Sequence, residues 1–347
     1  MVSSPNNPKS RSGTASPRSP IDEAESDAPI VADEILDETF DLDDNASSSA
    51  SITSSILRYR HENGRTYHAY KDGSYVYPND DRETYRLDIQ HNMFYLTLDG
   101  KLFLCPADPD KLHRILDCGT GTGSWAIDVA DDYPNAQVVG VDLSPIQPSF
   151  VPPNFHSFVD DLEDTWTHAH KFDLIYSRML IGSIGDWSRF FKQAYDNLNP
   201  GGWFEIADIV VPYECDDGTF PKDSALYKWM AYAIDAAAKF GKPLDATVTY
   251  AQRLREVGFV NVTERKFKWP TNNWPKDPKY KELGTWMYEN VGKNTAAMTL
   301  APFTRLLGWT AEEVEVFLID VRKEFKDPKI HAYAPIYIVY GQKPLET

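Results

Sequence analysis

A glycine-rich turn after a short apolar strand constrains this chain more than any other feature. The segment Arg114–Cys118 (RILDC) predicts a strand, and glycines then occupy every second position at Gly119, Gly121 and Gly123. Without side chains, the backbone can turn tightly and a ligand can approach its amides closely. A helix expected over 124–133 brings its N-terminal dipole to the same point. These features predict a ligand site at the end of the strand.

The spacing of the glycines separates two classes of ligand. A nicotinamide or flavin fingerprint, G-x-G-x-x-G, needs its third glycine at position 124, where the sequence has Ser124. The sequence instead reads D-x-G-x-G-x-G, with Asp117 two positions before the first glycine. This is the S-adenosylmethionine pattern, since that ligand has no phosphate to cradle and its ammonium group suits a carboxylate. A glycine-rich turn without a ligand is the alternative.

Strands and helices alternate along most of the chain. Apolar runs predict further strands at 137–143, 155–159, 172–176, 203–209, 260–269 and 334–340. Apolar residues at three- and four-residue steps predict helices at 187–198, 223–240 and 249–257. The capping-box pair Thr310 and Glu313 predicts the start of another helix. This alternation is typical of βαβ units around a parallel sheet, so we expect one α/β domain.

Polar residues stand at the ends of the predicted strands, where open α/β sheets bind ligands. Asp142 ends the second strand, and a carboxylate there can accept both ribose hydroxyls, or else cap a helix. Asp160 and Asp161 end the third strand, where Asp161 can take an adenine amino group and at least one of the pair is simply solvated. Ser177 and Arg178 end the fourth strand, beside the expected position of the sulfonium.

Seven short segments combine in a way that resembles one protein family. They are G-R-x-Y-H at 64–68, R-L-D-x-Q-H at 86–91, L-x-x-A-P at 102–106, W-A-I-D at 125–128, I-Q-P at 146–148, P-P-N at 152–154 and F-D-L-I-x-x-R-M at 172–179. The combination is similar to class I S-adenosylmethionine-dependent methyltransferases, and more narrowly to the fungal LaeA-like methyltransferase family. The resemblance is strong over 57–215 and looser over 216–347. Cys105 replaces the usual alanine of its segment.

The resemblance implies a Rossmann-like seven-stranded sheet with helices on both faces, whose final strand is antiparallel, and S-adenosyl-L-methionine as cofactor. Family members differ in use: LaeA itself is a nuclear regulator of secondary metabolism that works with velvet proteins, whereas relatives resemble tailoring enzymes. Three functions follow: methylation of a small molecule of secondary metabolism, a LaeA-like regulatory role with a velvet-type partner, and protein methylation. We expect the first, at a cytoplasmic and/or nuclear location.

The expected cofactor site combines the glycine motif with the polar strand ends. Arg65 and Tyr67 are also expected to close over the cofactor, because a cover must come from outside the sheet. The residues predicted to bind it are Asp117, Gly119, Thr120, Gly121, Gly123, Asp142, Leu143, Asp160, Asp161, Leu162, Ser177 and Arg65.

Methyl transfer mainly requires alignment of a nucleophile and exclusion of water, and a base helps if the acceptor is a hydroxyl. The catalytic candidates are Tyr67, His68, His91, Arg178 and Glu205. Each histidine has a structural hydrogen-bonding role as its alternative. Arg178 can bind the methionine carboxylate, an acidic acceptor or a local aspartate. Five tryptophans can line an aromatic acceptor pocket or belong to the core: Trp229, Trp269, Trp274, Trp286 and Trp309.

Charge and cysteine content exclude several other classes of protein. The net charge of −17 over 347 residues disfavours nucleic acid as a partner. Three cysteines cannot build a disulfide framework, and no Cys/His spacing is typical of zinc, so no metal is expected. The longest charge-free run, 143–159, contains four prolines, so we expect no membrane span.

Composition divides the chain near residue 55. Residues 1–54 contain three basic and 11 acidic residues and many serines, so we expect a disordered acidic tail, either solvating or interacting with a partner. The methyltransferase domain is expected over 55–347, with an N-terminal cover at 55–110 and a cofactor core at 111–212. A helical acceptor lid is expected within 213–249 and 270–332.

Overall fold

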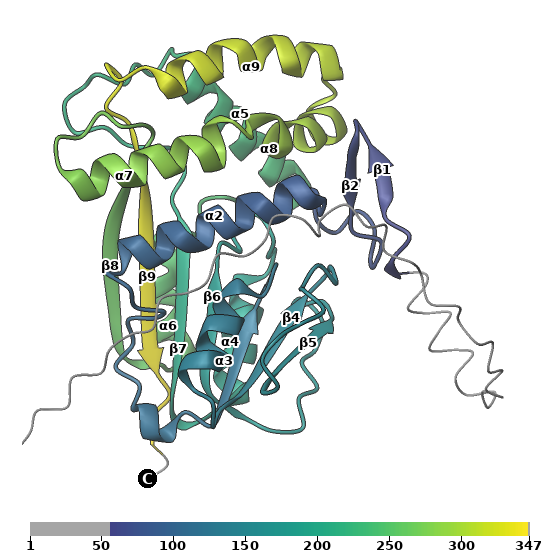
Figure 1. The fold of residues 1–347 in the computed structure, drawn as a ribbon, viewed down its shortest axis with the longest axis vertical. Helices are drawn as coiled ribbons and strands as arrows, with labels where there is room; N and C mark the ends of the chain where they lie inside the picture. Colours follow the sequence, from purple (N-terminus) through teal and green to yellow (C-terminus); the bar gives the residue numbers. More distant parts are fainter. Residues whose placement is uncertain (1–55, 346–347) are drawn as a thin grey trace, which may run out of the picture. The chain divides into compact units, whose positions relative to one another are not determined.

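The computed structural model describes residues 56–345. The tail predicted over 1–54 lies outside these described residues. Within them, the chain forms one seven-stranded sheet with helices on both faces and a helical layer beyond one end of the sheet (Figure 1). The predicted α/β fold is therefore confirmed.

Strand order in the sheet is β5-β4-β3-β6-β7-β9-β8. The strands are β3 (Arg114–Cys118), β4 (Gln137–Asp142), β5 (Phe155–Val159), β6 (Phe172–Arg178), β7 (Leu198–Ile209), β8 (Val260–Pro270) and β9 (Tyr333–Gln342). The first five pair in parallel, whereas β9 lies antiparallel between β7 and β8. The expected antiparallel final strand is thus confirmed, and all carboxyl ends of β3–β7 meet at one edge.

Strand β7 begins five residues before the predicted start at 203. The turn-like sequence Asn199–Gly202 hides this extension. Leu198 nevertheless pairs with Phe172 across an irregularity in the register, and the Gly201 amide donates to the Lys343 carbonyl at 2.9 Å. Pairing with two neighbouring segments therefore overrides the local turn signal.

Helices cover both faces of the sheet because alternate strand residues point to opposite sides. Leu116 and Cys118 pack with α4 (Trp187–Asn197) and α6 (Tyr250–Val257), and Ile115 packs with α3 (Ser124–Asp132) on the other side. This two-sided burial explains why the central strands read as nearly continuous apolar runs.

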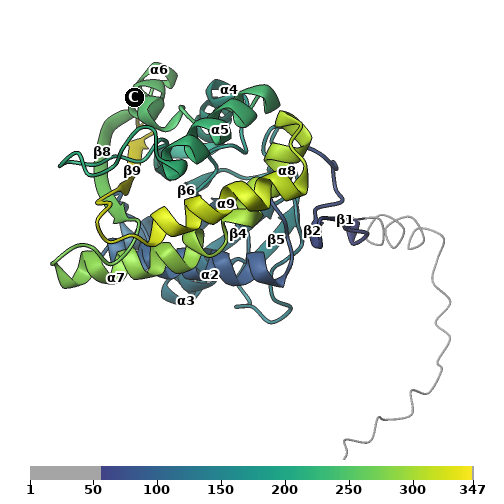
Figure 2. The same ribbon diagram turned by 90° about the horizontal axis from the view of Figure 1, so that it is seen from above.

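A layer of helices lies over the end toward which the parallel strands point, as Figures 1 and 2 show. It comprises α2 (Asp81–Thr97), α5 (Ala225–Phe240), α7 (Pro278–Met287), α8 (Thr295–Pro302) and α9 (Ala311–Lys326). These helices share one hydrophobic cluster with the ends of β8 and β9. The predicted capping box is present, because Thr310 accepts from the Glu313 amide and Glu313 accepts from the Thr310 amide.

Short elements complete the described chain. Strands β1 (Arg60–Glu62) and β2 (Arg65–Tyr67) form a hairpin beside this layer, and η1 (Pro109–Lys111) and η2 (Thr247–Thr249) are 3₁₀ turns. Two π-helical turns, η3 (Tyr288–Gly292) and η4 (Phe303–Leu307), follow α7 and α8.

Candidate functional site

The glycine turn leaves β3 in a conformation that suits glycine alone. Gly119, Gly121 and Gly123 have φ angles of +75°, +56° and +81°. A Cβ on Gly119 would lie 2.5 Å from Leu180 Cδ2, and one on Gly123 would lie 3.3 Å from Phe155. The turn is therefore a cradle that side chains would fill, as expected for a loop that a ligand approaches closely.

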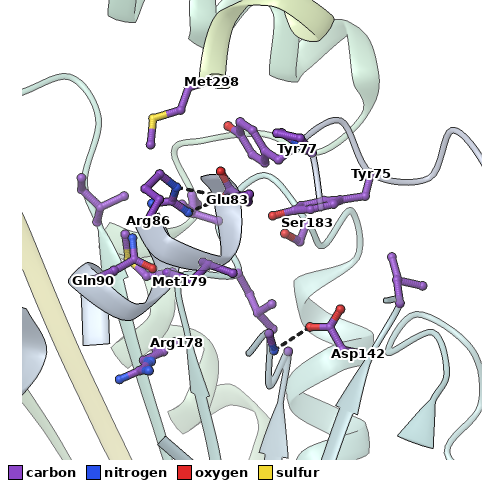
Figure 3. Close-up of a pocket in the computed structure, with 18 of the residues that line it drawn as sticks. Tyr75, Tyr77, Glu83, Arg86, Gln90, Asp142, Arg178, Met179, Ser183 and Met298 are labelled. Carbon is purple, nitrogen blue, oxygen red and sulfur yellow. Dashed lines mark hydrogen bonds and ion pairs between the residues drawn. The ribbon is translucent and has the colours of Figure 1, made fainter. Parts of the chain in front are cut away.

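A cavity of about 250 Å³ extends from this turn into the helical layer (Figure 3). It is larger than the roughly 150 Å³ engineered cavity that holds benzene, so it has room for more than one ring. One half is formed by the carboxyl ends of β3–β6. The predicted residues that line it are Gly119, Thr120, Gly121, Asp142, Leu143, Asp160, Asp161, Leu162 and Arg178.

Asp142 is fixed at the end of β4 by two backbone amides. Its carboxylate accepts from Gly121 N–H at 2.8 Å and from Ser144 N–H at 2.9 Å (Figure 3). Burial raises the pKa of Asp142, and the two amides act in the opposite direction. The carboxylate thus joins the glycine turn to the next strand and keeps acceptor capacity toward the cavity.

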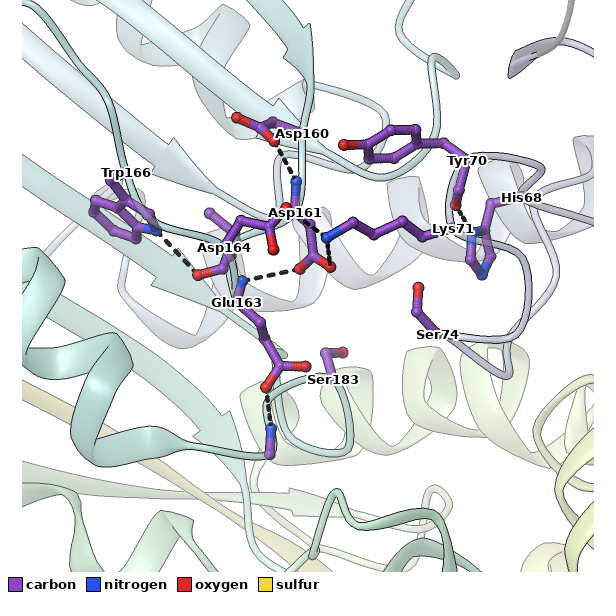
Figure 4. Close-up of polar contacts among 12 residues, drawn as sticks. His68, Tyr70, Lys71, Ser74, Asp160, Asp161, Glu163, Asp164, Trp166 and Ser183 are labelled. Carbon is purple, nitrogen blue, oxygen red and sulfur yellow. Dashed lines mark hydrogen bonds and ion pairs between the residues drawn. The ribbon is translucent and has the colours of Figure 1, made fainter.

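Asp161 pairs with a lysine from the N-terminal segment (Figure 4). Lys71 Nζ lies 2.8 Å from Asp161 and 2.5 Å from Asp164. Burial alone would raise the pKa of Asp161, but the hydrogen bond and charge of Lys71 outweigh it and lower that pKa. Asp160 accepts from the Asp161 amide at 2.8 Å. The segment around Lys71 is therefore fastened to the predicted adenine end.

Asp117 and Ser177 lie beneath the cavity and are not among its lining residues, nor is Gly123. Asp117 is 2% exposed, and burial raises its pKa to about 6, with the charge of Arg178 acting against this. Ser177 Oγ is buried without a hydrogen-bond partner among residues 56–345. Contact between these groups and a ligand remains a prediction.

The structure places Arg65, Tyr67 and His68 outside the cavity lining. Arg65 forms a two-pronged ion pair with Asp80, which caps α2. Tyr67 is 1% exposed and lies under the guanidinium of Arg305. The environments of these residues are those of fasteners of the N-terminal segment, not of groups that face a ligand.

His68 is enclosed by its own loop. Its ring nitrogens lie 2.7 Å from the Tyr70 carbonyl oxygen and 3.2 Å from that of Tyr75. Both neighbours are acceptors, so the ring organises the loop 70–75 and presents no free nitrogen to the cavity.

His91 and Glu205 also lie elsewhere than a catalytic base would. His91 Nε2 contacts Asp128 on α3 at 2.8 Å, which joins α2 to α3. Both oxygens of Glu205 accept from the Leu104 amide, and one also accepts from the Cys105 amide at 2.6 Å. Burial raises the pKa of Glu205 to about 7, although these amides lower it. These contacts are structural.

Sequence reasoning missed the face of α2 that lines the cavity. Glu83, Arg86, Leu87 and Gln90 recur at three- and four-residue steps and all line it. Arg86 donates to Glu83 at 2.9 and 2.7 Å and to Asn290 at 2.8 Å. The helical spacing within R-L-D-x-Q-H was the available signal, since Arg86 and Gln90 share one face.

Tyr75 and Tyr77 extend this polar wall from the preceding loop (Figure 3). The far half of the cavity is apolar and lies in the helical layer. Its lining includes Tyr213, Trp229, Met230, Trp269, Met287 and Met298. Of the five tryptophans singled out, Trp229 and Trp269 line the cavity and the other three do not.

Comparisons with known proteins agree with this geometry. A family model described as "Methyltransferase domain" matches residues 89–264. The chain is 43% identical over 302 residues to "Methyltransferase pytC" of Aspergillus terreus, covering 87% of this chain and 93% of that protein. It is 40% identical over 289 residues to "Secondary metabolism regulator LAE1" of Cochliobolus heterostrophus, covering 82% and 94%.

Among solved structures, the chain is similar to Haemonchus contortus phosphoethanolamine N-methyltransferase 2 in complex with S-adenosyl-L-methionine. The TM-score is 0.41 and the identity 17%, over 78% of this chain and 54% of that one. The [4+2]-cyclase SpnF gives a TM-score of 0.44 and 16% identity, over 74% and 82%.

The chain belongs to the methyltransferase-domain family. It is an S-adenosylmethionine-dependent methyltransferase whose relatives include both tailoring-type methyltransferases and LaeA-type regulators. The predictions of family, cofactor and enzyme class are confirmed. No helix within 56–345 is long and apolar enough to cross a membrane. The same residues contain no group of three or more potential metal ligands.

Proposed function

We propose that this protein methylates a small molecule of secondary metabolism. One observation supports this most: a single cavity joins the glycine turn to an apolar chamber inside the helical layer. Such a chamber suits a compact, largely apolar acceptor next to the cofactor. The name of the pytC relative, a methyltransferase at 43% identity, agrees with this proposal.

The proposed cofactor residues divide by position along the strand ends. Asp117 meets the ammonium group, directly or through water, and Asp142 accepts the ribose hydroxyls. Asp160, Asp161 and Leu162 surround the adenine, with Leu143 against the nucleoside. The positive φ angles of the glycine turn bring its backbone amides to the same ligand.

When bound, S-adenosylmethionine supplies a methyl group on a sulfonium centre, which an incoming nucleophile displaces. The task of this chain is to orient that nucleophile and exclude water. The apolar chamber orients the acceptor body through Trp229 and Trp269. Tyr75 and Tyr77 close the cavity from the side of the N-terminal segment.

A LaeA-like regulatory role is the second proposal, because the chain is 36% identical over 310 residues to "Secondary metabolism regulator laeA" of Aspergillus fumigatus. In that case a velvet-type protein would be its partner and the nucleus its location. Partner capture from an extract of the source cells is the test. Co-purification without any velvet-type protein would count against it.

Protein methylation is the third function on this list and has less support, because the chamber is enclosed by helices and has no extended groove among its lining residues. A labelled protein band would revive it.

Transfer of label from methyl-labelled cofactor into an extract tests the first proposal. We expect label in the organic-soluble fraction with the wild-type protein and none with Asp142→Asn, which weakens the ribose contact. Calorimetry with S-adenosylhomocysteine shows whether each preparation binds cofactor. A wild-type protein that binds cofactor yet labels only protein, or nothing, would contradict small-molecule methylation.

A further inference from the structure

Three positively charged side chains line the cavity within the described chain: Arg86, Lys242 and Arg178. Two of them are neutralised. Arg86 lies 2.7 Å from Glu83 and also donates to Asn290. Lys242 lies 2.9 Å from Glu163 and donates to two backbone carbonyls. Neither is available to a ligand without losing a buried partner.

Arg178 is different, because its guanidinium makes no hydrogen bond or ion pair with any residue in 56–345. The expected alternative, an ion pair with a local aspartate, is therefore absent there. The guanidinium lies 5.4 Å from the ring centre of Phe94. Phe94 in turn packs edge-to-face on Trp269, with ring centres 4.9 Å apart. The free charge thus stands at the border of the apolar chamber.

Gln90 adds a neutral polar group at the same border. It is 6% exposed, lines the cavity and forms no side-chain hydrogen bond within the described chain. Figure 3 shows Gln90 and Arg178 on one side of the cavity and Asp142 on the other. A polar ligand group between the chamber and the glycine turn would satisfy both side chains.

The cavity also lacks an evident base. The predicted candidates His68, His91 and Glu205 lie outside its lining, and no histidine is among the lining residues. Its carboxylates are already engaged: Asp142 by amides, Asp160 by the Asp161 amide, and Asp161 and Glu83 by cations. An acceptor that had to be deprotonated inside this cavity would find no free group for that step.

We propose that the acceptor is a ring-containing, mainly apolar oxygen acid that binds as its anion, with the anionic oxygen on Arg178. This inference rests on the proposed small-molecule function and names its substrate class. The apolar body occupies the chamber beside Trp229 and Trp269. A carboxylate or an acidic enol is ionised before it binds, so no base is required. A guanidinium is the side chain best suited to hold such a group.

The transfer step then balances without a proton. The anionic oxygen forms a bond to the methyl carbon while the carbon–sulfur bond breaks, and its electron pair goes to sulfur. One negative and one positive charge are both neutralised, leaving a methyl ester or enol ether and S-adenosylhomocysteine. The neutral product loses its attraction to Arg178, which favours release.

Two probes that differ only in charge test the inference: 2-naphthoate and 2-naphthamide. Their affinities are measured by calorimetry on the full chain saturated with S-adenosylhomocysteine. The wild-type protein should bind the carboxylate at least about tenfold more tightly, because a guanidinium pair is charge-assisted. Arg178→Met should reduce this preference to about one, and Arg178→Lys should retain part of it.

Arg114→Met is the matched control. Arg114 also lies over a phenylalanine ring, that of Phe172 at 5.8 Å, but at the other end of β3 and outside the cavity lining. This variant should keep the wild-type preference. If Arg114→Met loses the preference as well, the effect is a general charge effect and the inference is overturned.

Other outcomes are also decisive. Equal affinity for the two probes in the wild-type protein, or no binding of either, overturns the inference without use of any variant. Loss of S-adenosylhomocysteine affinity in Arg178→Met, with no probe preference in the wild type, would assign Arg178 to the cofactor carboxylate. The extract-labelling experiment fails or succeeds independently, so failure of the proposed function is distinguished from failure of the charge assignment.

Discussion

The ion pairs of Lys71 provide the sharpest prediction about cofactor exchange. Lys71 links the loop that carries Tyr75 and Tyr77 to Asp161 and Asp164, at 2.8 and 2.5 Å. If this loop roofs the cofactor, both pairs must break before the cofactor leaves. Lys71→Met removes the obstacle, so S-adenosylhomocysteine should dissociate faster.

The magnitude follows from the exposure of the pairs. Side-chain exposures are 34% for Lys71, 14% for Asp161 and 56% for Asp164, so solvent screens both interactions. Pairs of this kind contribute up to about 1 kcal/mol each, and about 1 kcal/mol in total is a reasonable sum. Since 1.4 kcal/mol corresponds to about tenfold, release should accelerate roughly three- to tenfold.

Stopped-flow release of S-adenosylhomocysteine measures this effect. Wild-type release should also accelerate as salt is raised, because salt screens the pairs, whereas Lys71→Met should respond little. Lys192→Met is the control, since Lys192 pairs with Asp196 at 2.5 Å on α4 away from the cavity. Equal release rates for wild type and Lys71→Met at low salt would refute the reasoning.

Three further predictions concern the turn, a buried acid and a histidine. Gly119→Ala should abolish measurable cofactor binding in calorimetry, since its Cβ meets Leu180, whereas Gly308→Ala has the same φ of +75° with open space and should lose only about 1–2 kcal/mol of stability in denaturant titrations. The folded-state pKa of Glu205, about 7, lies above its ordinary value, so the wild-type free energy of unfolding should fall as pH rises from about 4.5 to 7, and Glu205→Gln should flatten this slope; an unchanged slope would contradict the assignment. His91→Asn should lower thermal stability by removing the Asp128 contact but keep methyl transfer within about threefold; a loss of a hundredfold in an assay at fixed cofactor would restore His91 as a base.

Sequence predicted the sheet well because its signals are local. The strand at 155–159 matches β5 in both bounds, and the glycine turn forms the cradle that its spacing indicates. The start of β7 was wrong, because a glycine-proline turn signal at 199–202 competes with pairing to Phe172 that only the folded sheet provides.

The helix α2 was harder to predict for a physical reason. Its buried side chains include Glu83, Arg86 and Gln90, so the face turned inward is polar and no apolar stripe marks it. That inward polarity follows from the cavity, which is assembled from segments more than 200 residues apart, as in the Arg86–Asn290 bond. The catalytic candidates failed to reach the cavity for the same reason, since sequence does not show which way a loop histidine points.

Filling the acceptor chamber tests the central claim most directly. Ala233 lines the cavity from α5, so Ala233→Trp should occupy the chamber and leave the glycine turn untouched. The account predicts S-adenosylhomocysteine affinity within about threefold of wild type and at least about thirtyfold less label transferred to the organic fraction. The exposed neighbour Tyr232, changed to tryptophan, should transfer label normally. Undiminished transfer by Ala233→Trp would show that the acceptor binds elsewhere and would contradict the account.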